Sequence, residues 1–159
     1  MLARVFQAAA AAASAVALAA LAVLCAVTVL DVLGRFVLNK PLLGAVEMSE
    51  FLMVILSFGG LALAELRNGH ISVDFFVAAL PGRARALLDA AGALLGVVFW
   101  GFVAWRATVH SGRVWAFGEV SANLALPVWP FYLAVTVGCG LLSLALIGRV
   151  IRSLRAGLA

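Results

Sequence analysis

Long stretches without a single charged residue constrain this chain more than any other feature of its sequence. Residues 5–30 and 120–148 contain no Asp, Glu, Lys or Arg, and a helix needs about 20 predominantly apolar residues to cross a membrane core about 30 Å thick. Charged residues make up 11% of the chain, against about 25% in soluble proteins. A soluble domain of this size buries only about 70% of the surface that its unfolded chain exposes. The excess apolar surface must face lipid, which excludes a cytosolic enzyme and a secreted domain.

The charges that separate the apolar stretches predict four membrane-spanning helices, at residues 8–30, 44–65, 86–105 and 128–149. The second must start near Gly44, because the uncharged residues 51–64 are too few to cross the membrane. Pro127 and Pro130 suit the start of the fourth helix. We therefore predict an all-α integral membrane protein, with one domain over residues 1–159 and short interfacial helices. The first stretch resembles a signal peptide, but it is long enough to span, and we expect it to be retained.

The basic residues predict how these helices are oriented. With four spans, both termini lie on the same side of the membrane, together with the loop at 66–85. This side holds seven of the eleven Lys and Arg residues, and the side with the loops at 31–43 and 106–127 holds four. Short loops rich in Lys and Arg face the cytoplasm. The sequence thus predicts cytoplasmic termini, one inner loop and two outer loops.

Residues suited to catalysis or to metal binding are sparse. The two histidines fall on opposite sides of the membrane, His70 in the inner loop and His110 in an outer loop, so they cannot share a metal ion or a haem. The central parts of the spans lack the ionisable residues that ion transport requires. The basic residues form no continuous stripe, which argues against nucleic-acid binding. We assign no catalytic residue, metal ligand or cofactor, and we expect no nucleic-acid partner.

Three charged residues lie close in sequence to the outer boundary of the first two spans. Glu47 and Glu50 are three residues apart and share one face of a helix, and Arg35 follows the first apolar stretch. Two interpretations remain open. The three residues either form an ion-pair cluster that fixes the two spans together, or they reach headgroups and water separately.

Small residues spaced three or four apart indicate where helices can approach each other closely. They either pack the four helices together or dock a partner chain. The predicted packing positions are Ser57, Gly60 and Ala64 in the second span, Gly92 and Gly96 in the third, and Ala134 and Gly138 in the fourth.

Three stretches carry a resemblance to a known family. In chain order they are Arg35, Asn39, Pro41, Glu47 and Glu50; Gly60, Arg67, Gly69-His70-Ile71, Val73 and Asp74; and Leu126-Pro127-Val128-Trp129 with Tyr132. At these spacings the chain resembles the small membrane subunit of tripartite ATP-independent periplasmic (TRAP) transporters. One departure is that the family often has an aromatic residue before the glutamates of the second span, where residues 43–46 read Leu-Gly-Ala-Val.

The resemblance implies two protein partners in the bacterial inner membrane and periplasm. A large multi-span subunit would carry the substrate and sodium sites. A soluble binding protein would capture an organic acid, such as a C4-dicarboxylate or sialic acid. The small subunit would stabilise the large one, help to dock the binding protein and contact membrane lipids. It would hold no cofactor, because sodium is expected only in the large subunit.

Two groups of residues become candidates for these roles. The outer basic residues suit docking to an acidic patch on the binding protein, and they are Lys40, Arg106, His110 and Arg113. The inner loop would form a brace in which Arg67 or His70 pairs with Asp74, beside the turn at Gly69.

Two other readings of the sequence stay open. The small subunit of a tripartite tricarboxylate transporter shares the size and hydropathy of this chain. A membrane anchor subunit of a redox enzyme is a further alternative, although no histidine lies within a span.

Overall fold

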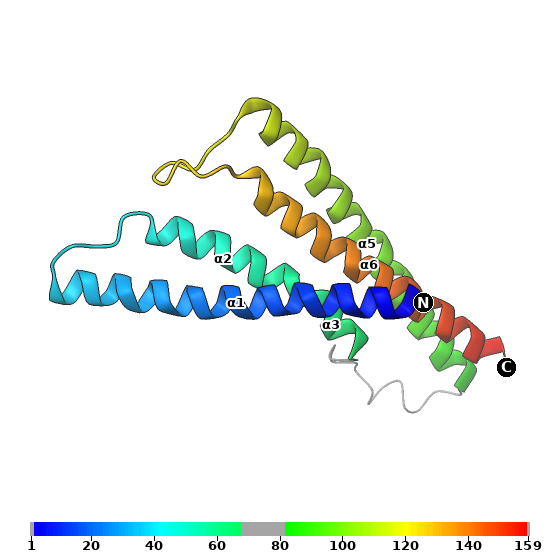
Figure 1. The fold of residues 1–159 in the computed structure, drawn as a ribbon. Helices are drawn as coiled ribbons and strands as arrows, with labels where there is room; N and C mark the ends of the chain where they lie inside the picture. Colours follow the sequence, from blue (N-terminus) through cyan, green and yellow to red (C-terminus); the bar gives the residue numbers. More distant parts are fainter. Residues whose placement is uncertain (1, 68–81, 159) are drawn as a thin grey trace.

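All regular elements in the part of the chain that the structure describes are helices. The structure, a computed structural model, describes residues 2–67 and 82–158. The helices are α1 (Leu2–Val37), α2 (Ala45–Gly59), α3 (Leu61–Leu66), α5 (Gly82–Phe117) and α6 (Trp129–Leu158) (Figure 1). The stretches apolar and long enough to cross a membrane are Arg4–Val37, Ala45–Leu66, Ala84–Phe117 and Trp129–Arg155. The predicted all-α fold with four spans is confirmed.

Two helices extend well beyond the predicted spans. α1 continues to Val37 and α5 to Phe117, so both outer loops predicted at 31–43 and 106–127 begin as helix. Charged residues mark the edge of the apolar segment, whereas a helix ends where the backbone leaves the helical conformation. Asn39 follows α1 with a φ of 50°, and Gly118 follows α5 with a φ of 64°. Both adopt the left-handed conformation that commonly ends a helix.

The second span is divided at Gly60, which separates α2 from α3. A Cβ atom added at Gly60 would meet only the Leu56 carbonyl, at 4.0 Å. Gly60 therefore marks a break in the helix. The close contact with another helix that its spacing predicted is not found there.

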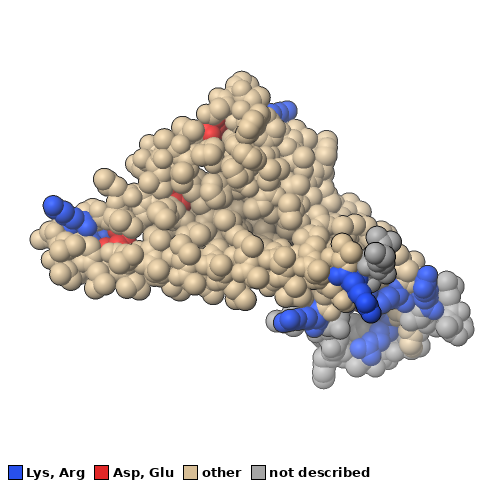
Figure 2. Space-filling view, viewed as in Figure 1, with Lys and Arg blue, Asp and Glu red and all other residues tan. Residues whose placement is uncertain are grey.

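The helices form two hairpins, α1 with α2 and α5 with α6 (Figure 1). The hairpins lie close together at the end that carries both chain termini, which we call the terminal end. They diverge toward the opposite end, the loop end, where residues 38–44 and 118–128 connect the helices (Figure 1). Figure 2 shows Lys and Arg side chains gathered at the terminal end, while the body between the two ends is almost free of charge on this face.

The first hairpin is held together by small residues. The buried positions of α1 follow a spacing of three or seven residues and are Ala10, Ala17, Ala20 and Val27. A Cβ atom added at Gly59 of α2 would lie 2.8 Å from the Ala13 carbonyl oxygen and 3.0 Å from the Ala17 Cβ. The alanine-rich start of the chain thus lets the two backbones approach closely.

The second hairpin and its contact with α2 use glycines in the same way. A Cβ added at Gly96 of α5 would lie 2.9 Å from Leu146 Cδ1 of α6, and one added at Gly138 of α6 would overlap the Phe58 carbonyl of α2. These two positions from the predicted packing set lie at close helix contacts. A Cβ at Gly92 would meet nothing within 4 Å.

The other predicted packing positions have looser surroundings. Ser57 is exposed, while Ala64 and Ala134 are half-buried. Ala134 lies beside Gly138 in a groove between α2 and α6, and α1 forms part of its wall.

Replacing Gly138 by alanine should loosen the contact between α6 and α2. The added methyl group overlaps a backbone carbonyl, which cannot move unless the helices separate, and overpacking costs about 1–3 kcal/mol. We expect a melting temperature in detergent several degrees below that of the unmodified protein. Gly140→Ala is the matched control, because the space around Gly140 is open. Equal melting of the two variants would contradict this packing.

Candidate functional site

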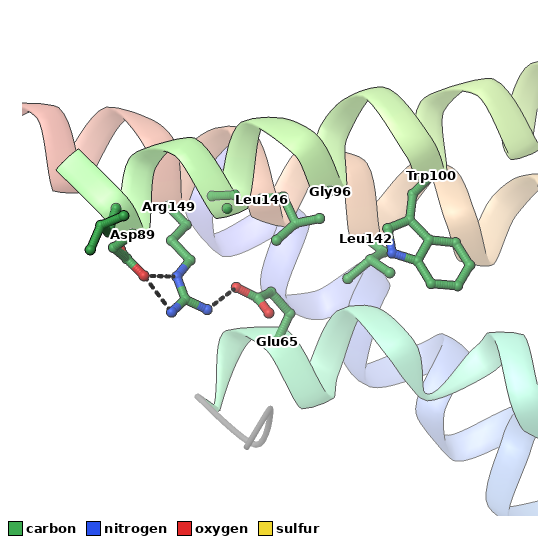
Figure 3. A pocket seen from close by; sticks show the side chains of 10 residues that line it. Glu65, Asp89, Gly96, Trp100, Leu142, Leu146 and Arg149 are labelled. Atoms are coloured by element: carbon green, nitrogen blue, oxygen red, sulfur yellow. Dashed lines mark hydrogen bonds and ion pairs between the residues drawn. The ribbon is translucent and has the colours of Figure 1, made fainter. Parts of the chain in front are cut away.

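One arginine joins three helices at the terminal end. The Arg149 guanidinium of α6 donates to Asp89 Oδ1 of α5 from Nε at 2.9 Å and from Nη2 at 2.6 Å. Its Nη1 donates to Glu65 Oε1 of α3 at 3.2 Å (Figure 3). Ser153 of α6 also donates to the second oxygen of Asp89. We call Glu65, Asp89, Arg149 and Ser153 the terminal-end cluster.

The burial of these side chains explains why they are paired. The Glu65 side chain is only 4% exposed, while those of Arg149 and Asp89 are 29% and 34% exposed. A carboxylate inside a membrane protein is costly unless a cation or hydrogen-bond donors compensate its charge. The planar guanidinium presents several donors in a fixed geometry, so it can serve two carboxylates at once.

A groove runs from this cluster along α5 and α6. It has a volume of about 300 Å³. Its apolar wall consists of Leu88, Gly92, Ala93, Gly96, Trp100, Leu142 and Leu146. Glu65, Asp89 and Arg149 close one end of it (Figure 3). Within residues 2–67 and 82–158, no three His, Cys, Asp or Glu side chains are grouped to hold a metal ion.

Sequence reasoning did not connect the members of the terminal-end cluster. Glu65 and Arg149 are 84 residues apart. One sequence feature could have indicated the cluster: Glu65, Asp89 and Arg149 each lie near the terminal end of a different span. An even number of spans brings those ends to one side, where opposite charges can meet.

A second polar contact joins the two hairpins at the loop end. Glu47, in the first turn of α2, is 9% exposed. Its Oε1 accepts hydrogen bonds from the Asn123 backbone N–H at 2.7 Å and from Asn123 Nδ2 at 3.0 Å, and its Oε2 accepts one from the Leu124 N–H at 3.0 Å. One carboxylate thus satisfies three donors of the loop between α5 and α6.

The shape of the chain before α2 supports this contact. Gly44 has a φ of 77°, and a Cβ there would lie 2.5 Å from the Leu124 side chain. A glycine is therefore required both for the left-handed backbone and for the close approach of Leu124.

The predicted cluster of Arg35, Glu47 and Glu50 does not form among the described residues. Arg35 Nη2 instead donates to Asp31 Oδ2 at 2.6 Å, one turn earlier in α1. The other oxygen of Asp31 accepts the Leu42 N–H at 3.0 Å. A partner four residues away in the same helix is available without ordering a second helix. Glu47 binds the 121–124 loop, and Glu50 is exposed.

The outer basic residues lie on two separate elements. Lys40 is exposed in the connection between α1 and α2. Arg106, His110 and Arg113 are exposed along the last turns of α5. Lys40 belongs to the first hairpin and the other three residues belong to the second, and the hairpins diverge toward the loop end (Figure 1). The His110 ring also packs edge-on against Tyr132 of α6, with centroids 4.6 Å apart.

The proposed inner-loop brace falls mostly outside the described residues, which do not include Gly69, His70 or Asp74. Arg67 is described: it is exposed, and its backbone N–H donates to the Leu63 carbonyl at the end of α3. The pairing of Arg67 or His70 with Asp74 stays a prediction.

Replacing Arg149 by methionine should weaken the junction of α3, α5 and α6. The change leaves two carboxylates without their shared cation, and losing the partner of a buried polar group costs about 1–3 kcal/mol. We expect a lower melting temperature in detergent and earlier proteolysis. Arg155→Met, at an exposed arginine of α6 without an ion pair among the described residues, is the control. If both variants melt together, the terminal-end cluster does not stabilise the fold.

Replacing Glu47 by alanine should release the loop before α6 without unfolding the helices. The Asn123 and Leu124 amides lose their acceptor, so we expect their hydrogen exchange to accelerate at least about tenfold, which corresponds to about 1.4 kcal/mol of local opening. Glu119→Ala is the control, because the Glu119 side chain is exposed. Unchanged exchange at these two amides would contradict the contact.

Comparison with known proteins places the chain among membrane transport components. Residues 24–156 match the model of the DctQ component of tripartite ATP-independent periplasmic transporters. The chain is also similar to the ectoine TRAP transporter small permease protein TeaB of Halomonas elongata, with 27% identity over 112 residues. This match covers 70% of the chain and 58% of the relative, so the chain spans less than two thirds of that protein's length.

The family match supports the resemblance over the two alternatives, a tricarboxylate transporter subunit and a redox-enzyme anchor. It covers most of the chain, including three of its four apolar spans in full and part of the first. The chain is therefore a multi-pass inner-membrane protein and a transport component rather than an enzyme, and it belongs to the DctQ family of TRAP transporter small permease subunits.

Proposed function

We propose that this chain is the scaffold subunit of a sodium-coupled transporter that receives an organic acid from a periplasmic binding protein. The observation that carries the proposal is where the charges lie. In the described spans, charged residues occur only toward the ends. Those that form the two polar contacts of the fold join helices to each other at the terminal end, or a helix to a loop at the loop end. Such an arrangement stabilises a bundle and offers no ionisable path across it.

The large subunit is the partner that this arrangement requires. Transport needs groups that bind the solute and the coupling ion within the membrane, and we assign both to the large subunit. The small subunit contributes rigid surface, since its helices expose large apolar side chains along most of their length. Membrane lipids cover the part of that surface that no protein occupies.

The proposed orientation places the terminal end in the cytoplasm. Its Lys and Arg side chains follow the rule that basic loops stay inside (Figure 2). The loop end then faces the periplasm, with Arg106 and Arg113 on α5 and the loop held by Glu47. These basic residues suit docking of an acidic patch on the binding protein.

The solute is proposed at the level of its class. A C4-dicarboxylate and a sialic acid are the candidates that the family resemblance supports. The name of the similar protein TeaB adds ectoine to the solutes that must be tested.

Reconstitution tests this function directly. The chain is co-expressed with the large membrane subunit of a TRAP transporter from the same organism, purified by a tag on the chain, and placed in vesicles with the matching binding protein. We expect the large subunit to co-purify and solute uptake to require an inward sodium gradient. Vesicles that contain the large subunit alone are the control and should lose most of the uptake. Purification of the chain without a second membrane protein would contradict the proposal.

A further inference from the structure

One face of α2 combines exposure to the surroundings with polar side chains. Val46, Glu50, Met53 and Ser57 follow each other at intervals of three or four residues and so lie on one side of the helix. All four are exposed. We call them the α2 stripe. The Glu50 carboxylate makes no hydrogen bond or ion pair within the described part of the chain.

The position of Glu50 along the span makes this exposure unusual. Glu50 and Glu65 are fifteen residues apart, which is about 22 Å along a helix, and the break at Gly60 cannot lengthen that distance. The hydrocarbon core is about 30 Å thick. At least one of the two carboxylates must therefore lie at the level of the core. Glu65 has Arg149 as its cation, whereas the Glu50 carboxylate has no cation partner among residues 2–67 and 82–158.

A groove beside Glu50 shows what kind of side chain fits there. It lies between α2 and α6 and has a volume of about 220 Å³. Its lining consists of Glu50, Phe51, Val54, Val128, Phe131, Tyr132 and Val135. One carboxylate thus stands among apolar and aromatic walls, and the Phe51 and Phe131 rings stack with centroids 3.8 Å apart.

These walls match the two parts of a long basic side chain. The aliphatic stem of Lys or Arg packs against apolar surface. Its charged head is attracted both to an aromatic ring and to a carboxylate. A lipid tail would satisfy the apolar walls but would leave the Glu50 charge uncompensated.

We propose that the α2 stripe is the surface on which the large membrane subunit packs, and that a Lys or Arg side chain of that subunit enters the groove and pairs with Glu50. The inference rests on the proposed function, which supplies the partner. The stretch of α5 from residue 94 to residue 102 offers a contrast, because its exposed residues are all apolar: Leu94, Leu95, Val98, Phe99 and Phe102. That stretch suits lipid.

Site-specific photo-crosslinking tests which face is covered. A photoreactive phenylalanine analogue replaces Met53, which is 48% exposed, or Val98, which is 65% exposed, in the chain co-expressed with its large subunit in native membranes. We expect a crosslink to the large subunit from position 53 and none from position 98. In an intact complex, a crosslink from position 98 alone, or from position 53 to a second copy of this chain, would overturn the inference.

Charge substitutions test the pairing itself. Glu50→Lys should reduce recovery of the large subunit in co-purification at least about tenfold, because two cations then face each other in a desolvated site. Glu50→Gln should reduce it less. Glu119→Lys, at an exposed glutamate of the loop between α5 and α6, is the control and should leave recovery unchanged. Full recovery with Glu50→Lys would overturn the pairing.

The two proposals fail in different ways. Loss of the large subunit from the unmodified chain would overturn the proposed function and this inference together. An intact complex with sodium-dependent uptake, in which position 53 gives no crosslink to the large subunit and Glu50→Lys changes nothing, would overturn the inference alone. The melting temperature of each isolated variant shows whether its fold is intact, since Glu50 and Met53 are both exposed.

Discussion

The guanidinium of Arg149, held between Asp89 and Glu65, is the contact on which the relative placement of the two hairpins depends most. In lipid, apolar helices gain little by burying apolar side chains against each other, because the acyl chains are equally apolar. Close packing of small residues and polar contacts must then decide which helices meet. Glu65 belongs to the first hairpin, and Asp89 and Arg149 belong to the second. This ion-pair cluster joins the hairpins where they converge (Figure 3).

The loop end solves the same problem with different chemistry. There the hairpins diverge (Figure 1), and the Glu47 carboxylate reaches across to backbone N–H groups instead of a cation. Between the two ends, Gly138 has no side chain, and this absence lets α6 approach the Phe58 backbone of α2. Two polar contacts and the close approach of Gly138 to Phe58 thus join the two hairpins, and apolar surface remains for partners and lipid.

Hydropathy was sufficient to predict the four spans, since the apolar stretches are bounded by charges. It could not predict where α1 and α5 end, because a helix continues past the lipid boundary until a residue such as Asn39 or Gly118 turns the chain. The local pairing of Arg35 with Asp31 follows from their spacing of four residues. The pairing of Glu65 with Arg149 does not, because it depends on how hairpins distant in sequence pack together.

The proposed role of Glu50 links stability to assembly. In the isolated subunit, the exposed Glu50 carboxylate of a membrane-spanning helix pairs with no cation among the described residues, which raises the free energy of that state. A basic side chain from the large subunit removes this penalty, so complex formation gains more than its apolar contact area alone would provide. A wrong partner without such a cation is disfavoured for the same reason, since it would cover the carboxylate without compensating it. One exposed glutamate on α2 can thus contribute both to the affinity of the complex and to the choice of partner, while Glu65, whose cation lies within the chain, serves the fold.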